Sequence, residues 1–78
     1  PLFVYPNPAD EQLNVEWAGT GEVLFVLFST DGQMIDMIAI EEKEVGQIST
    51  KDLSPGPYYY KVSADSGFVK SGRIVIVR

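Results

Sequence analysis

Apolar and polar residues follow one another along the chain in short runs, and residues that favour turns separate these runs. Residues 13–17 alternate strictly, with Leu13, Val15 and Trp17 on one face of a predicted strand. Turn signals recur about every 8–12 residues, a spacing typical of a β-sandwich or barrel. The pattern predicts an all-β fold, an antiparallel Ig-like β-sandwich of about seven strands, over residues 2–5, 13–17, 23–28, 34–40, 45–48, 58–64 and 68–77.

Residues 23–28 differ from the other predicted strands because every position is apolar. Such a strand is typically central in its sheet and covered on both faces, or else shielded by a partner. In the remaining strands, alternation assigns one face to the core. We therefore expect the core to contain Leu13, Val15, Trp17, Phe25, Leu27, Ile38, Ile40, Leu53, Tyr58, Tyr60, Val62, Ile74 and Ile76.

Three short segments carry more specific local predictions. Gly32 follows an aspartate in the clearest hairpin signal of the chain, and it is expected to adopt a positive φ angle. Residues 49–53 have the composition of one helical turn, with Ser49 or Thr50 as its cap. Gly72 interrupts the last predicted strand, where it favours a β-bulge.

The composition predicts one small folded domain over residues 1–78. Of its residues, 45% are hydrophobic and 12% are aromatic, far from the profile of a disordered chain. There is no Cys, so neither a disulfide nor a thiolate metal site contributes to stability. The net charge is −5 and the 6 basic residues are scattered, which argues against a nucleic-acid partner and against an anionic membrane surface. No apolar run approaches the roughly 20 residues that a membrane-spanning helix needs, so membrane insertion is not expected.

The residue inventory also argues against catalysis and against a cofactor. The chain contains no His and no Cys, which excludes a His-based triad and a thiol nucleophile. Carboxylates such as Asp10 and Asp31 fall at predicted turns, where solvated acids are expected. Glu41, Glu42 and Glu44 offer oxygens that suit calcium, but the favoured interpretation is a charged turn that keeps the sheet soluble. We predict no catalytic, cofactor-binding or metal-binding residue.

Three consecutive tyrosines raise the question of a platform for stacking on sugars. Because neighbouring residues of a strand point to opposite faces, Tyr58 and Tyr60 are expected in the core and only Tyr59 outside. One exposed ring does not form a platform, so we interpret the three residues as core packing with one surface tyrosine.

Four motifs follow one another in order along almost the whole chain. Their residues are Tyr5, Pro6, Asn7 and Pro8; Asp31 and Gly32; Leu53, Gly56 and Tyr58; and Lys70, Arg73 and Arg78 of a hydrophobic final strand. This succession resembles the C-terminal sorting domain of cargo proteins of the type IX secretion system (the Por secretion system) in the Bacteroidetes. Two positions depart from the family pattern. Pro57 stands where an apolar or β-branched residue is usual, and Arg78 stands where Lys is usual.

The resemblance implies a C-terminal secretion signal and no catalytic role. In this family an upstream signal peptide brings the cargo to the periplasm. The outer-membrane translocon and its shuttle protein then recognise the sorting domain. A surface sortase commonly removes the domain and joins the cargo to a surface lipopolysaccharide, so the cargo ends at the cell surface or outside. The chain opens on Pro1 without a basic region or a long apolar stretch, which indicates a piece of a longer protein, with the cleavage point at or before residue 1.

The final strand is the expected recognition element. If residues 73–78 form an exposed edge, their backbone can pair with a strand of another protein. Lys70, Arg73 and Arg78 are expected to form a positive end that steers the domain to the translocon. The alternative is that these basic residues only guard the edge against aggregation. We also expect the isolated domain to form weak homodimers through such an edge strand.

A second function stays open on the sequence alone. The chain also has the size and the turn pattern of a generic Ig-like or fibronectin-like spacer domain of a secreted hydrolase or adhesin.

Overall fold

The computed structural model describes residues 2–77, which form seven strands and contain no helix that could cross a membrane. The strands are β1 (Leu2–Tyr5), β2 (Gln12–Trp17), β3 (Val23–Phe28), β4 (Met34–Ile40), β5 (Val45–Ser49), β6 (Gly56–Ala64) and β7 (Val69–Ile76). Every pair of neighbouring strands is antiparallel. The predicted all-β, seven-stranded fold is confirmed.

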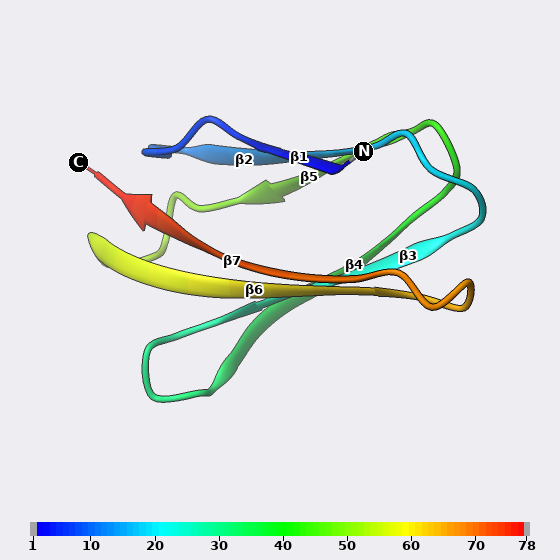
Figure 1. Ribbon diagram of the computed structural model, residues 1–78. Coiled ribbons are helices and arrows are strands. Elements are labelled where there is room, and N and C mark those ends of the chain that lie inside the picture. The colour runs from blue at the N-terminus through cyan, green and yellow to red at the C-terminus, as the bar shows by residue number, and fades with distance from the viewer. Residues whose placement is uncertain (1, 78) are drawn as a thin grey trace.

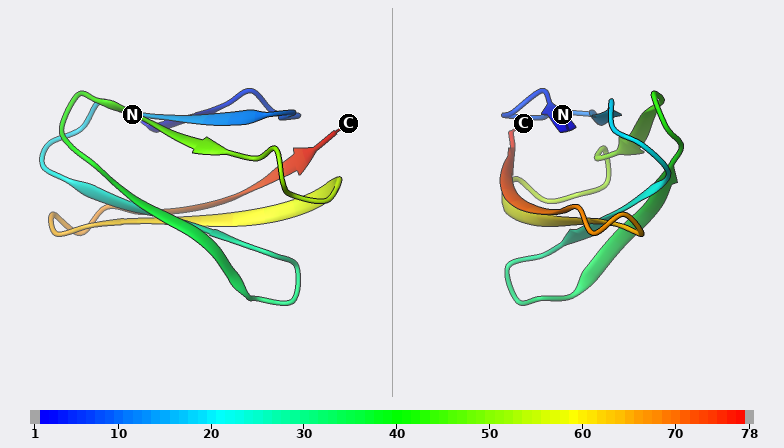
Figure 2. Two further views of the ribbon diagram at one scale, coloured as in Figure 1. Left: turned by 180° about the vertical axis from the view of Figure 1, so that it is seen from behind. Right: turned by 45° about the vertical axis from the view of Figure 1, so that its right-hand side comes forward.

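The strands form two sheets that face each other as a sandwich (Figure 1). One sheet has the order β1-β2-β5 and the other the order β4-β3-β6-β7. The connections β2–β3, β4–β5 and β5–β6 cross from one sheet to the other. Figure 2 shows the two layers from behind and from a second side, with the end of β7 rising out of the larger sheet toward the smaller one.

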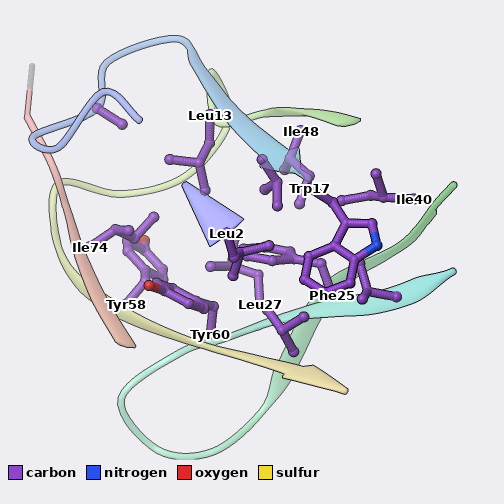
Figure 3. Close-up of a cluster of buried hydrophobic side chains, with 14 of the residues drawn as sticks. Leu2, Leu13, Trp17, Phe25, Leu27, Ile40, Ile48, Tyr58, Tyr60 and Ile74 are labelled. Atoms are coloured by element: carbon purple, nitrogen blue, oxygen red, sulfur yellow. The ribbon is translucent and has the colours of Figure 1, made fainter. Parts of the chain in front are cut away.

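The core fills the space between the sheets (Figure 3). Phe25 and Leu27 of the central strand β3 are fully buried, and the ring of Phe25 stacks on that of Tyr60 with centroids 5.2 Å apart. Burying a side chain of this size contributes roughly 1.5–3 kcal/mol. The predicted core is confirmed: all its members are buried except Ile38 and Leu53, which are half-buried and pack against it.

The hairpin between β3 and β4 has a three-residue loop. The Ser29 N–H donates to Gln33 O at 2.9 Å, and the Gly32 N–H donates to Ser29 O at 3.0 Å. Gly32 has a φ of 86°, as predicted, whereas Asp31 does not share the positive φ. This is the geometry of a type I turn followed by one residue in the left-handed region.

Two local predictions are wrong. Residues 49–53 form a hydrogen-bonded turn, with the Leu53 N–H donating to Thr50 O at 3.1 Å, and not a helical turn. Gly72 does not form a bulge, because the register of β6 and β7 runs through it without a shift. Gly72 instead makes room for the phenol ring of Tyr60 directly opposite, which a Cβ atom at this position would overlap. A register shift occurs between β3 and β4, at Leu27 and Phe28.

Strand β3 is central in its sheet, as predicted, but the second layer covers only one of its faces. Val23, Phe25 and Leu27 are buried against the smaller sheet, whereas Leu24 on the other face is 38% exposed. The sequence left two explanations for the apolar strand at residues 23–28: cover of both faces within the chain, or shielding by a partner. Within residues 2–77, the chain does not cover the second face.

Candidate recognition site at one end of the sandwich

The predicted motif turns, far apart in sequence, lie at one end of the sandwich. That end holds the β1–β2 loop, the β3–β4 hairpin, the β5–β6 turn and the end of β7, at the left in Figure 1. The hydrogen bonds agree with the picture: the Thr50 N–H of the β5–β6 turn donates to Glu11 O of the β1–β2 loop at 2.9 Å. The pairing of Phe28 with Tyr59 brings the β3–β4 hairpin to the start of β6. Sequence reasoning identified the motifs but did not predict that they meet.

Residues 6–9, which we call the edge hook, bind the outward edge of β7. The side-chain amide of Asn7 imitates a peptide group: its Nδ2 donates to Arg73 O at 3.2 Å, and its Oδ1 accepts from the Val75 N–H at 3.1 Å. Ala9 continues the contact as a short parallel bridge. Its N–H donates to Val75 O, and its carbonyl accepts from the Val77 N–H, both at 2.8 Å. The Tyr5–Pro6 and Asn7–Pro8 peptide bonds are both cis.

The hook corrects the prediction of an exposed final edge. Four backbone groups of this edge, Arg73 O, the N–H and carbonyl of Val75 and the Val77 N–H, already have partners in Asn7 and Ala9, so they are not free to pair with another strand. Arg78 lies outside the described residues. The presence of Asn7 in the motif therefore has a structural explanation, because its side chain covers a sheet edge. Covering an edge is a common protection against unwanted strand pairing.

The third motif closes the β5–β6 turn. The phenol of Tyr58 is buried, and its hydroxyl donates to Ser54 O at 2.6 Å. Gly56 has a φ of 134°, which a residue with a Cβ atom rarely adopts. Leu53 packs against the core from the same turn. The spacing of these three residues thus follows from the shape of one turn.

Thr50 joins this turn to the β1–β2 loop and was not identified as a site residue from the sequence. It is the one polar side chain among the fully buried described residues, and its Oγ1 donates to Asp10 O at 2.8 Å. The sequence did contain a signal for this position. Thr50 stands two residues after Ile48, so the alternation of the strand places both side chains on the inward face.

Two motif residues have perturbed ionisation. Desolvation against the sheet and the hydrogen bond from its hydroxyl to Glu16 Oε1 (3.2 Å) raise the pKa of Tyr5. The hydroxyl of Ser29 donates to Asp31 Oδ1, and this bond, together with a backbone bond at Gln33, lowers the pKa of Asp31. Asp31 therefore stays charged at the tip of the hairpin and fixes the turn.

Lys70 and Arg73, the two predicted basic residues within the described part of the chain, do not lie together. Lys70 lies opposite Val62, and its Nζ donates to Leu2 O of the other sheet at 3.3 Å. Arg73 lies three residues along β7, about 10 Å away, and shares the outward face of the larger sheet with Tyr59. Lys70 thus bridges the two sheets along their seam, while Arg73 is the basic residue nearest the motif end among the described part of β7.

The remaining candidate residues lie elsewhere. Residues 41–44 form the β4–β5 turn at the opposite end, where Glu42 Oε1 accepts from the Gly21 N–H at 2.9 Å. No group of acidic side chains within residues 2–77 has the geometry of a metal site, and these residues enclose no pocket. Tyr58 and Tyr60 are buried and Tyr59 is 45% exposed, so the predicted alternation of the tyrosines is confirmed.

Comparison with known proteins identifies the family that the motif sequence resembles. The family model described as the secretion system C-terminal sorting domain matches residues 3–77. None of the curated proteins compared with the chain matches it.

Proposed function

Because the chain belongs to the family of secretion system C-terminal sorting domains, we propose that residues 1–78 act as one sorting domain that directs a cargo protein through the type IX outer-membrane translocon. In this proposal the domain is a transport signal and not an enzyme. It needs no cofactor.

The observation that carries the proposal is the convergence of the family motifs at one end of the sandwich. The edge hook, the β3–β4 hairpin and the β5–β6 turn come from three separate parts of the chain, and the motif end also holds the last described residues of β7. A composite surface of this kind supports recognition of the folded domain. The edge hook and the β5–β6 turn are held by hydrogen bonds to neighbouring elements, and the β3–β4 hairpin is closed by its own. We propose that the shuttle protein of the translocon reads this end.

Cleavage and attachment follow from the same assignment. A surface sortase would cut the linker at or before residue 1, and the cargo would remain at the cell surface or be released outside. Arg73 presents its charge beside the motif end, which supports a role for it in steering the domain to the shuttle protein. Lys70 and Arg78 belong to the same proposal as carriers of positive charge.

The test is export of a fluorescent reporter placed between a signal peptide and residues 1–78 in a type IX-competent bacterium. We expect the reporter at the cell surface or in the medium. If it stays in the periplasm while a known sorting domain exports it in the same strain, the chain is an Ig-like spacer and the proposal fails.

Two further variants separate recognition from folding. Deletion of residues 73–78 removes the strand segment that the edge hook binds, so both stability and export should fall. Replacement of Lys70, Arg73 and Arg78 by Gln keeps the strand and removes the charge. Normal export of this Gln variant would show that the basic residues protect an edge and are not read by the translocon.

A further inference from the structure

The outward face of the larger sheet carries a continuous apolar surface that no part of the described chain covers. It runs over three neighbouring strands, because Val26 is paired with Met37, and Phe28 with both Met34 and Tyr59. Its exposed members include Met34 at 56%, Met37 at 49% and Tyr59 at 45%. We call this surface the outer apolar face; its residues are Leu24, Val26, Phe28, Met34, Met37 and Tyr59.

The smaller sheet shows what an ordinary outward face of the same molecule looks like. There Glu16 separates the two exposed apolar residues Phe3 and Val45, with which it is paired. The neighbouring outward positions of β2 and β5 are occupied by Gln12, Asn14, Gln47 and Ser49. A sheet with one face in the core usually alternates in this way, with polar residues outside. Strand β3 does not, which points to a partner on the larger sheet.

Charge narrows the chemistry of that partner. Among the described residues, the outward positions of β4, β3, β6 and β7 carry two charged side chains, Lys61 beside Val26 and Arg73 beside Tyr59. Asp36 is exposed on the edge strand β4 beside the register shift, where its Oδ1 accepts from the Met37 N–H at 2.8 Å. Lys61 and Arg73, within the sheet, are both basic, on a chain whose net charge is −5. Tyr, Phe, Met and Arg are also the residues enriched at protein–protein interfaces.

We infer that the outer apolar face is a second docking surface of the sorting domain, and that it binds an apolar protein surface bearing carboxylates on a component of the secretion machinery. The inference rests on the proposed function. It adds a contact on the sheet face that adjoins the motif end, because Phe28, Met34 and Tyr59 lie where the two meet. The end identifies the domain, and the face supplies apolar contact area. The apolar residues exclude water, and Lys61 and Arg73 pair with the carboxylates at the rim.

The chain offers matched variants for a test. Met37 and Val45 are both 49% exposed, on edge strands of opposite sheets, so Met37→Glu and Val45→Glu make the same change on the outer apolar face and on the ordinary face. Lys61→Glu and Lys43→Glu form the charge pair, because Lys43 lies on the β4–β5 turn. Thermal unfolding of each purified 78-residue variant first shows whether it is folded like the unmodified chain.

Export of the reporter fusion is then measured for all four variants. We expect Met37→Glu and Lys61→Glu to lower export at least tenfold, and Val45→Glu and Lys43→Glu to leave it unchanged. Lys61→Arg should restore export. Equal export by all four folded variants, or equal loss in all four, overturns the docking face while leaving the proposed function intact. Failure of the unmodified fusion overturns the proposed function and this inference with it.

Two binding measurements test whether a lipid surface or a second copy of the chain binds the outer apolar face instead. Sedimentation with vesicles of phosphatidylglycerol and phosphatidylethanolamine tests a lipid surface, and analytical ultracentrifugation of the chain alone tests a second copy. We expect neither vesicle binding nor a dimer that depends on Met37. Either one, if abolished by Met37→Glu and kept by Val45→Glu, overturns the assignment to the secretion machinery.

Discussion

The edge hook allows a quantitative test of how the chain covers its own last strand. Asn7→Ala removes the two hydrogen bonds that its side chain makes with Arg73 O and the Val75 N–H. A typical hydrogen bond contributes about 1 kcal/mol to stability, and these two are exposed, so water replaces part of the loss. We expect the free energy of unfolding to fall by about 1–2 kcal/mol. In a domain of this size that change lowers the melting temperature by roughly 4–8 °C per kcal/mol.

The measurement combines urea unfolding with hydrogen exchange. The Val75 amide should exchange faster in Asn7→Ala than in the unmodified chain, because its acceptor is gone. The matched control is Asn14→Ala. Asn14 lies on the outward face of β2 and accepts from Gln12 Nε2 at 2.9 Å. This control should change the stability by no more than about 0.5 kcal/mol and should leave Val75 exchange unaltered.

The result decides whether the hook is a structural device. If Val75 exchanges at the same rate in both variants, the amide of Asn7 does not protect the edge and the reasoning is wrong. Equal losses of stability from Asn7→Ala and Asn14→Ala would refute the hook in the same way. A slower-exchanging Val75 in Asn7→Ala would show that another group takes the place of the hook.

Three further changes test other features of the fold. Gly32→Val should cost on the order of 1–2 kcal/mol through strain at a φ of 86°, and an unchanged midpoint in chemical denaturation would contradict this. Gly72→Ala should cost about 1–3 kcal/mol because its Cβ overlaps the ring of Tyr60; the double variant with Tyr60→Phe should recover part of the loss in the same assay. The lowered pKa of Asp31 means that its contribution to stability is present at neutral pH, above its ordinary value, and is lost as the pH falls through the lowered value. Ser29→Ala should raise that pKa toward the ordinary value, which NMR titration of the carboxyl group measures; no change would show that the hydroxyl of Ser29 is not the cause.

Most of the fold was predictable because its signals are local. Alternation in residues 13–17 and 58–64 assigns each side chain to a face, and the structure has the same assignment. The turn at Gly32 was predictable for the same reason: an Asp-Gly pair between apolar runs already selects a hairpin. No knowledge of the second sheet is needed for either prediction.

The site was less predictable because its contacts are not local. The bonds between Asn7 and β7 join residues 66 and 68 positions apart in sequence, and nothing near Asn7 indicates which strand it will reach. The same holds for Gly72, where the glycine suggested a bulge but the reason for it is a tyrosine on the neighbouring strand. Thr50 was interpreted as a possible helix cap because it stands in a run of polar residues, 49–52, whose composition is typical of a turn.

We propose that a partner meets the sheet face and not the final edge at residues 73–77. A strand that pairs with β7 at residues 73–77 must first displace Asn7 and Ala9, so it exchanges existing hydrogen bonds for new ones of similar strength. Association itself costs an estimated 4–15 kcal/mol in lost freedom, and such an exchange does little to offset that cost. Docking on the outer apolar face displaces only water, and each apolar Å² removed from water contributes about 25 cal/mol. Each apolar face of residues 23–28 then has its own explanation. The inward face forms the core of the sandwich, and the outward face forms the docking surface that we propose.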